Sequence, residues 1–374
     1  MTEEKGISLC ALMLDPYDVC PGQRFRIEQW EPYLNNKGIK VDYYPFTDEN
    51  LRNVIYQEGR VASKVVELTK ATFRRIGHVL KASKYDAVLL YRAANMIGPA
   101  WMEKFMRMRG YPIIFDFDDA IFMTDVSKAN ERFKWAKFSG KTADICRLST
   151  GITVGNEYLA EYARRYNDNV HVVPTSIDTN RYQPVKNKPE NERVIIGWTG
   201  SSTSQYHLEE FEPVLAELVK RRSDIEIRVI SNRKPAFKSV PFVWREWSAA
   251  TEVEETSSFD IGIMPLPDND WTRGKCAAKA LICMSLGIPA ICSDVGANRE
   301  VIKHGENGFL AKTPEQWLNC FEALIDDRVL RNRFGAAARQ TVVENYSMER
   351  CGRMFAEVIR ETVKDKNSKG RNLS

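Results

Sequence analysis

The sequence predicts an α/β protein made of two Rossmann-like domains, each built on a parallel sheet. Short apolar runs of strand length alternate along the chain with amphipathic helical stretches, as expected for βαβ units. The runs are continuously apolar, which is typical of parallel strands covered on both faces. The 374 residues are enough for two such domains. We expect the sheets to face each other across a cleft, because ligands of open α/β sheets bind beyond the carboxyl ends of the strands.

The expected strands fall into two sets, separated by a linker. The first set is 7–14, 39–44, 87–91, 112–117, 151–154 and 170–173. The second set is 194–200, 225–230, 259–265 and 289–293. Between them, residues 178–193 are rich in proline and asparagine and hold no apolar run, a composition typical of linkers. We therefore expect an N-terminal domain over 1–178, a C-terminal domain over 179–345, and a last helix with a disordered tail over 346–374.

Composition and charge argue against several classes of protein. The 54 basic and 50 acidic residues leave a net charge of +4, too small to indicate a nucleic-acid partner. The longest uncharged apolar run, 280–292, is interrupted by Gly287 and Pro289 and is too short to span a bilayer. The eight cysteines form no CxxC pair, and we expect reduced, packed thiols, no metal site and a cytoplasmic protein.

A glycine turn follows the first strand of the second half, in the segment VIIGWTGSSTS. The strand is expected to end at Trp198, and Gly200, Ser201 and Ser202 then lead into a helix. The free N–H groups of a helix start suit a phosphate. An ordinary strand–helix turn with a serine cap is the alternative.

Cationic side chains gather after a later strand of the same half. Lys275 and Lys279 are four residues apart, which on a helix would place them on one face, and Arg273 precedes them. Compact positive charges beyond the end of a parallel strand would neutralise a diphosphate. A solvated helix face is the alternative.

Two motifs of the first half also follow expected strands. In YPIIFDFDDAIF, the carboxylates of Asp116, Asp118 and Asp119 suit ligand hydroxyls, a metal ion or acid–base chemistry, with helix capping as the alternative. In PGQRFR, the small Gly22 allows a tight turn, and the arginines suit phosphate binding unless they are ordinary surface residues. These arginines are Arg24 and Arg26.

Together these motifs resemble the family-4 retaining glycosyltransferases with the GT-B fold, a family of group 1 glycosyltransferases. The strongest similarity is KALICMSLGIPAICSDVGANREVIKHGENGFL, residues 279–310, which resembles the sugar-nucleotide-binding segment. Residues 174–184 are similar to the interdomain linker. The resemblance implies that a hexose-type sugar moves from a nucleotide-sugar donor to a glycan, lipid-linked or polysaccharide acceptor. It also implies retention of configuration, no metal and no cofactor, with the last helix crossing back onto the first domain.

The resemblance also implies roles for individual residues. Lys275 and Lys279 would face the diphosphate of the donor, and Gly200 would lie against it. Asp118 would stand where related enzymes place a histidine near the transferred sugar. The expected catalytic residues are Asp118, Asp119 and Lys279. The expected donor-binding residues are Gly22, Arg24, Arg26, Gly200, Ser201, Ser202, Arg273 and Lys275.

Two departures from the family pattern leave other functions open. The paired glutamates of the family would fall at Gly274 and Ile282, and neither is acidic. The Arg and Lys that usually follow the glycine turn are replaced by a stretch with serines, Tyr206 and His207. An inactive relative that binds a nucleotide sugar, or a nucleotide-sugar epimerase of the GT-B fold, are the alternatives.

Basic residues are concentrated in the first half. Residues 60–84 contain seven Lys or Arg and one acidic residue, together with apolar residues at helical spacing, and residues 101–109 add basic and aromatic side chains. Such a helix either covers a Rossmann core or makes shallow contact with anionic lipid. The second possibility would place the protein at the inner face of the cell membrane.

Overall fold

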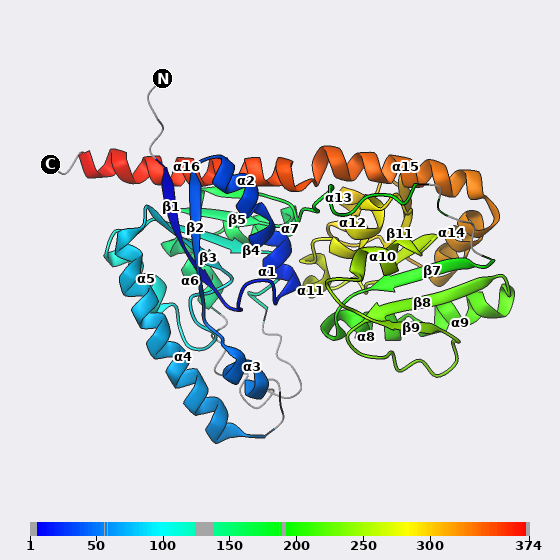
Figure 1. Cartoon of the computed structure of the whole chain (residues 1–374), viewed down its shortest axis with the longest axis horizontal. Helices are drawn as coiled ribbons and strands as arrows, with labels where there is room; N and C mark the ends of the chain where they lie inside the picture. Colours follow the sequence, from blue (N-terminus) through cyan, green and yellow to red (C-terminus); the bar gives the residue numbers. More distant parts are fainter. Residues whose placement is uncertain are drawn as a thin grey trace. The chain divides into compact units, whose positions relative to one another are not determined.

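The protein consists of two compact units, each with its own sheet. The computed structural model describes residues 6–55, 57, 59–123, 138, 140–186, 188 and 192–371 (Figure 1). Unit 1 comprises residues 1–174 and 351–374, and unit 2 comprises residues 175–350. Each unit contains a six-stranded sheet in which every pair of neighbouring strands is parallel. The predicted fold class, two parallel α/β sheets, is confirmed.

Unit 1 has the strand order β2-β1-β3-β4-β5-β6. Its strands are β1 (Ile7–Met13), β2 (Ile39–Pro45), β3 (Ala87–Tyr91), β4 (Ile113–Phe117), β5 (Gly151–Val154) and β6 (Val170–Val172). Every residue of β3, β4 and β5 is buried. This explains their continuous apolar sequence, because central parallel strands have no solvent-facing side.

The helices of unit 1 connect these strands. They are α1 (Pro21–Arg26), η1 (Glu28–Trp30), α2 (Glu31–Asn36), α3 (Glu49–Ile55), α4 (Val61–Lys81), η2 (Ala82–Lys84), α5 (Trp101–Met108), α6 (Lys141–Leu148) and α7 (Glu157–Arg164). The last helix, α16 (Met348–Arg371), begins in unit 2 and joins unit 1 from Cys351 onward, as expected for a crossover helix. It runs beside α2 in Figure 1, and its Phe355 ring lies 4.8 Å from the ring of Trp30. It also covers β5, since a Cβ atom on Gly151 would lie 3.0 Å from the Thr362 hydroxyl.

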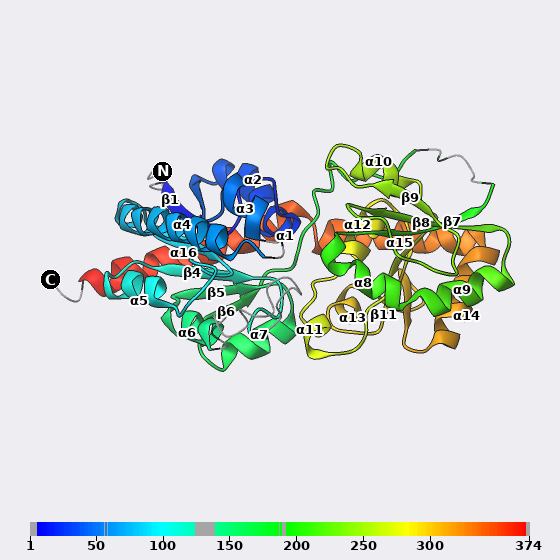
Figure 2. The same cartoon turned by 90° about the horizontal axis from the view of Figure 1, so that it is seen from below.

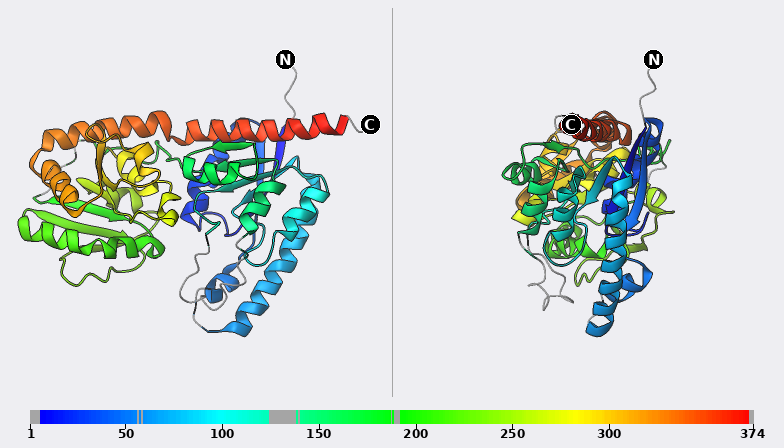
Figure 3. Two further views of the ribbon diagram at one scale, coloured as in Figure 1. Left: turned by 180° about the vertical axis from the view of Figure 1, so that it is seen from behind. Right: turned by 90° about the vertical axis from the view of Figure 1, so that its left-hand side faces the viewer.

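Helix α4 buries two basic residues and exposes several apolar ones. The sequence predicts an apolar face that includes Val65, Phe73 and Leu80, yet these side chains are between 56% and 70% exposed. The buried positions of α4 are Lys64, Ala71, Arg75 and Val79. The buried Arg75 guanidinium explains this orientation, because it donates hydrogen bonds to the carbonyl of Tyr44, at 2.9 Å, and to that of Met13. Figure 3 shows α4, in light blue, as a long helix with one end beyond the strands.

Unit 2 has the strand order β12-β11-β10-β7-β8-β9. Its strands are β7 (Val194–Thr199), β8 (Ile225–Ser231), β9 (Val243–Glu246), β10 (Ile261–Met264), β11 (Ala290–Ser293) and β12 (Gly308–Ala311). Its helices are α8 (Ser202–Glu210), α9 (Glu212–Arg221), α10 (Glu252–Ser257), α11 (Asp270–Arg273), α12 (Ala278–Ser285), α13 (Asn298–Val301), α14 (Pro314–Asp326) and α15 (Arg328–Asn345). The edge strands β9 and β12 were not among the expected strands. Both are only four residues long, and β9 carries two exposed charged residues.

The core of unit 2 joins its sheet to α8, α9 and α14. Trp198, Leu215 and Phe321 are buried in one cluster, and Figure 2 shows α9 beside α14. On α15, Arg339 donates hydrogen bonds to the carbonyls of Thr179, Tyr182 and Ser285, at 2.6–2.8 Å. This one guanidinium therefore ties the segment before β7 and the end of α12 to α15.

The cysteines and the helix lengths complete the description. All eight cysteines are free thiols, six of them buried, which confirms the prediction of unpaired, packed cysteines. Over the described ranges of the chain, no helix is both long enough and apolar enough to cross a membrane.

Candidate functional site

Lys279 crosses directly over Gly200 at the carboxyl end of β7. A Cβ atom on Gly200 would lie 2.6 Å from Cε of Lys279 and 2.6 Å from the Trp198 ring. Only glycine leaves room for this crossing. The amine of Lys279 lies 5.5 Å from the centre of the Trp198 ring, within cation–π distance. The structure thus brings together two residues that the sequence analysis assigned to the diphosphate.

Lys275 belongs to the same neighbourhood, but it does not lie on the helix of Lys279. Helix α11 ends at Arg273 and α12 begins at Ala278, with Ala277 in the left-handed region at φ +53°. The predicted shared helix face is therefore wrong. Lys275 instead places its amine 4.8 Å from the centre of the Trp271 ring.

Both lysines act electrostatically on one histidine. Burial, together with the positive charges of Lys279 and Lys275, lowers the pKa of His207 to about 4. His207 lies on α8, so α8, the 274–277 loop and α12 converge here. Sequence reasoning set His207 apart from the site, since isolated histidines are usually structural.

The two serines after Gly200 already have hydrogen-bond partners. The Ser201 hydroxyl lies 2.7 Å from that of Thr203, and the backbone N–H of Ser202 donates to the side-chain oxygen of Asn232 at 2.7 Å. A phosphate oxygen on the Ser202 N–H would have to displace Asn232. Sequence reasoning could not have found Asn232, which follows a different strand.

Arg273 is paired with two nearby carboxylates. Its guanidinium lies 2.8 Å from Asp268 and 3.1 Å from Asp270. These partners offset its charge, so it adds less positive potential to the site than Lys275 and Lys279. Its backbone is held closely: a Cβ atom on Gly296, where φ is +51°, would lie 2.6 Å from the Arg273 carbonyl oxygen.

In unit 1, Asp118 and Asp119 share a single guanidinium. Arg92 contacts Asp118 at 2.7 Å and Asp119 at 2.8 Å, and the Tyr91 hydroxyl donates to Asp118 at 3.0 Å. Arg92 directly follows β3 and takes φ +63°, a left-handed conformation that costs energy for a residue with a side chain. Sequence reasoning missed Arg92, although its place after a buried strand was a usable signal.

The carboxyl of Asp118 is held in its charged form. Burial alone would raise its pKa, but the charges of Arg92 and Arg26 and the hydrogen bonds from Arg92 and Tyr91 outweigh burial and lower the pKa. A carboxylate with a lowered pKa is a poor proton donor at neutral pH. Within the parts of the chain that the structure describes, no three His, Cys, Asp or Glu side chains gather as metal ligands would.

Arg26 has no role at a ligand site, which corrects the sequence-based expectation. Its side chain is fully buried and forms an ion pair with the equally buried Asp116. It also donates to the carbonyl of Val173, and the Thr153 hydroxyl donates to Asp116 at 2.6 Å. This network ties α1 to β4 and β5, so it leaves no guanidinium edge for a phosphate.

Of the other two candidate residues of the PGQRFR motif, Gly22 lies at the edge of the Asp118 cluster. A Cβ atom on Gly22 would lie 2.8 Å from the Tyr91 hydroxyl and 3.1 Å from the Asp118 carboxylate, so a side chain there would displace the cluster. Arg24 lies 3.7 Å from Asp18 and is mostly buried.

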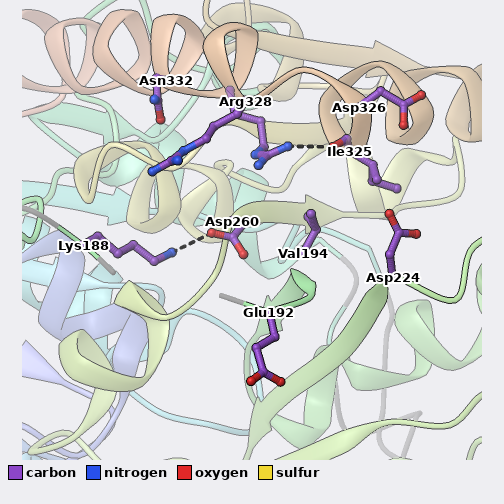
Figure 4. Close-up of a pocket in the computed structure, with 10 residues that line it drawn as sticks. Lys188, Glu192, Val194, Asp224, Asp260, Ile325, Asp326, Arg328 and Asn332 are labelled. Atoms are coloured by element: carbon purple, nitrogen blue, oxygen red, sulfur yellow. Dashed lines mark hydrogen bonds and ion pairs between the residues drawn. The ribbon is translucent and has the colours of Figure 1, made fainter. Parts of the chain in front are cut away.

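A cavity of about 350 Å³ lies at the opposite edge of the unit 2 sheet (Figure 4). It is lined by residues that precede or begin strands, such as Asp224, Asp260 and Val194, and by the start of α15. Lys188 pairs there with Asp260 at 3.0 Å. None of the predicted site residues lines this cavity, which lies at the amino ends of the strands.

Comparisons with known proteins find a sequence match within unit 2 and a fold match over nearly the whole chain. Residues 280–341, which begin one residue after Lys279, match the family model "Glycosyl transferases group 1". The chain also resembles a sucrose-phosphate synthase from Thermosynechococcus elongatus, at 13% identity and a TM-score of 0.67 over 96% of this chain and 99% of that one. Residues 280–341 thus resemble a segment of group 1 glycosyltransferases, and the two sheets have the GT-B fold of these solved structures.

Two further solved structures share this glycosyltransferase fold. HepE from Anabaena, in complex with UDP and glucose, matches at 12% identity and a TM-score of 0.66, over 95% of this chain and 100% of that one. The catalytic domain of starch synthase IV from Arabidopsis thaliana, bound to ADP and acarbose, matches at 12% identity and a TM-score of 0.68, over 96% and 100%.

A curated relative extends the sequence similarity. Glycosyltransferase 1 domain-containing protein 1 from Xenopus tropicalis is 30% identical over 84 residues, which make up 22% of this chain. The aligned part spans about a quarter of that relative's length, 24%.

Proposed function

We propose that the protein transfers a hexose-type sugar from a nucleotide-sugar donor to a glycan, lipid-linked or polysaccharide acceptor. The observation that carries this proposal is the match of residues 280–341 to group 1 glycosyltransferases on a GT-B fold. Retention of anomeric configuration is part of the proposal. The nucleotide sugar is a substrate, and the proposed reaction uses neither a cofactor nor a metal.

In this proposal, Lys275 and Lys279 bind the diphosphate of the donor. Negative charge grows on the nucleoside diphosphate as the sugar leaves, and fixed positive charges aimed at it lower the barrier. The rings of Trp198 and Trp271 position the two amines. The UDP and ADP bound to HepE and starch synthase IV support a nucleoside diphosphate as the leaving group.

Asp118 and Asp119 are proposed to bind sugar hydroxyls as hydrogen-bond acceptors. The lowered pKa of Asp118 supports an acceptor role over proton donation. Arg92 is the positioning residue, because its guanidinium contacts both carboxylates. Gly22 leaves the space that this arrangement needs.

We also propose that α4 and α5 make shallow contact with anionic lipid at the cytoplasmic face of a membrane. The supporting observation is the outward apolar face of α4, to which α5 adds the exposed Trp101 and Met108. The exposed bases of these segments are Arg60, Lys70, Lys81, Lys84, Lys104, Arg107 and Arg109. Apolar side chains surrounded by bases suit the boundary of an anionic bilayer.

A panel of nucleotide sugars tests the proposed reaction. Each donor is incubated with the protein and simple glycan acceptors, and the products are followed by NMR. Release of nucleoside diphosphate with a new α- or β-linkage that keeps the donor configuration supports the proposal. An epimerised nucleotide sugar would indicate the epimerase instead. Binding without turnover of any donor would indicate an inactive relative.

A further inference from the structure

His207 is a buried polar side chain that lacks a partner. It is 4% exposed, and among the described residues neither of its ring nitrogens has a hydrogen-bond partner. The nearest carboxylate oxygen, on Glu210, lies 3.9 Å from Nδ1, which is beyond hydrogen-bond distance. Buried polar atoms in native proteins are nearly always hydrogen-bonded, so such an orphan needs an explanation.

The surroundings of His207 point to an anion as the missing partner. Its charged neighbours are Lys275, Lys279 and the exposed carboxylate of Glu210. With its pKa lowered to about 4, the ring is neutral at pH 7 and has one N–H to donate. Two ammonium groups and one uncommitted N–H together match the oxygens of a phosphate group.

The position of His207 in the chain fits this assignment. It lies in the second turn of α8, the nine-residue helix that follows Gly200. From Ser201 to Val219 the chain has no Lys or Arg. Within this stretch, His207 offers a buried ring N–H that has no partner among the described residues.

We propose that His207 binds a phosphate oxygen of the donor's diphosphate through a ring N–H, alongside Lys275 and Lys279. This assignment rests on the proposed nucleotide-sugar reaction and names a third residue of the same site. The bound anion satisfies the orphaned ring nitrogen. It also offsets the lysine charges, so the pKa of His207 rises when the ligand binds.

The test compares His207→Phe with the wild-type protein. The variant keeps a flat aromatic ring and removes both nitrogens. Binding of UDP, ADP and GDP is measured by calorimetry, and the melting temperature without ligand is measured alongside. We expect at least tenfold weaker binding and an equal or higher melting temperature, because the variant removes an unpaired buried polar group. Unchanged affinity, whatever the melting temperature, would assign His207 a purely structural role.

A matched control and a second measurement separate the outcomes. His78 is a half-buried histidine on α4 whose pKa is lowered to about 4 by burial and by nearby basic side chains, and His78→Phe should leave binding unchanged. NMR titration of His207 in the wild-type protein, with and without UDP, reports the rise in pKa even if His207→Phe does not fold. If UDP binds but the pKa of His207 does not change, the assignment of His207 is overturned while the proposed function stands. A wild-type protein that binds no nucleoside diphosphate overturns the proposed function as well.

Discussion

The Cε atom of Lys279 lies where a side chain on residue 200 would begin, 2.6 Å from the Cβ position of Gly200. Gly200→Ala should therefore displace Lys279 from the turn and weaken the binding of nucleoside diphosphates at least tenfold, as measured by calorimetry. Gly77→Ala is the matched control, because a Cβ atom on Gly77 meets nothing within 4 Å. It lies inside α4 and should raise the free energy of unfolding by up to about 1 kcal/mol without changing binding. Equal affinities of the two variants for nucleoside diphosphates would mean that the contact between Lys279 and Gly200 is not part of the binding site.

Removing either lysine of the site should weaken diphosphate binding. Lys275→Ala and Lys279→Ala should each raise the Kd for UDP or ADP about tenfold, corresponding to about 1.4 kcal/mol. The double variant should lose more, and its residual binding should depend less on salt concentration. Lys303→Ala, which removes an exposed lysine of the same unit, is the control. A Kd that does not change for Lys279→Ala would contradict the assignment of the diphosphate.

Removing Arg92 should destabilise unit 1 in a pH-dependent way. Arg92→Ala leaves the Asp118 carboxylate buried without its main partner, at a cost of about 2–4 kcal/mol near pH 7. In the wild-type protein the lowered pKa of Asp118 stabilises the fold above its ordinary pKa, and this stabilisation is lost as pH falls through the native value. In the variant, burial raises the pKa, so protonation should relieve the destabilisation.

Urea denaturation between pH 3 and pH 7 measures this effect. The difference in free energy of unfolding between the wild-type protein and Arg92→Ala should be largest at neutral pH and shrink toward pH 3. Arg109→Ala, which removes an exposed arginine next to α5, should show a small and constant difference. A pH-independent loss for Arg92→Ala would mean that the ion pair with Asp118 contributes little.

The outward face of α4 should bind anionic vesicles. The wild-type protein should float with phosphatidylglycerol-containing vesicles at low salt and much less with neutral ones. The double variant Val65→Ser/Phe73→Ser should lose most of this binding and keep its stability, because both side chains are exposed. Val329→Ser, at a residue of α15 that is 78% exposed, should leave flotation unchanged. Absence of wild-type flotation would refute the membrane contact.

The strands and the Gly200–Lys279 pair were accessible to sequence reasoning for a physical reason. Buried parallel strands must be apolar on both faces, so they stand out as continuous runs. The edge strands β9 and β12 escaped notice because both are only four residues long and β9 carries exposed charged residues. Gly200 and Lys279 each follow a strand, and the carboxyl ends of parallel strands share one edge of a sheet.

Other features depend on contacts between distant segments and leave no periodic signal. The helix break before α12 depends on Ala277 in a left-handed conformation. Alanine favours helices, so the sequence gives no sign of this break. The reversal of α4 depends on backbone carbonyls of β1 and β2 that accept from Arg75. Arg26 was expected at a ligand site, but its partner Asp116 lies 90 residues away in the chain. A carboxylate that neutralises a buried arginine cannot be located by spacing alone.

The split composition of unit 1 affects the order in which the protein can fold during synthesis. Unit 2 is one continuous segment, whereas unit 1 needs residues from Cys351 onward. Until the ribosome has released α16, the ring of Trp30 and the backbone at Gly151 have no cover from Phe355 and Thr362. Unit 1 is thus begun before unit 2 but completed after it. While unit 2 folds, the nascent unit 1 exposes the apolar surface that α16 later covers.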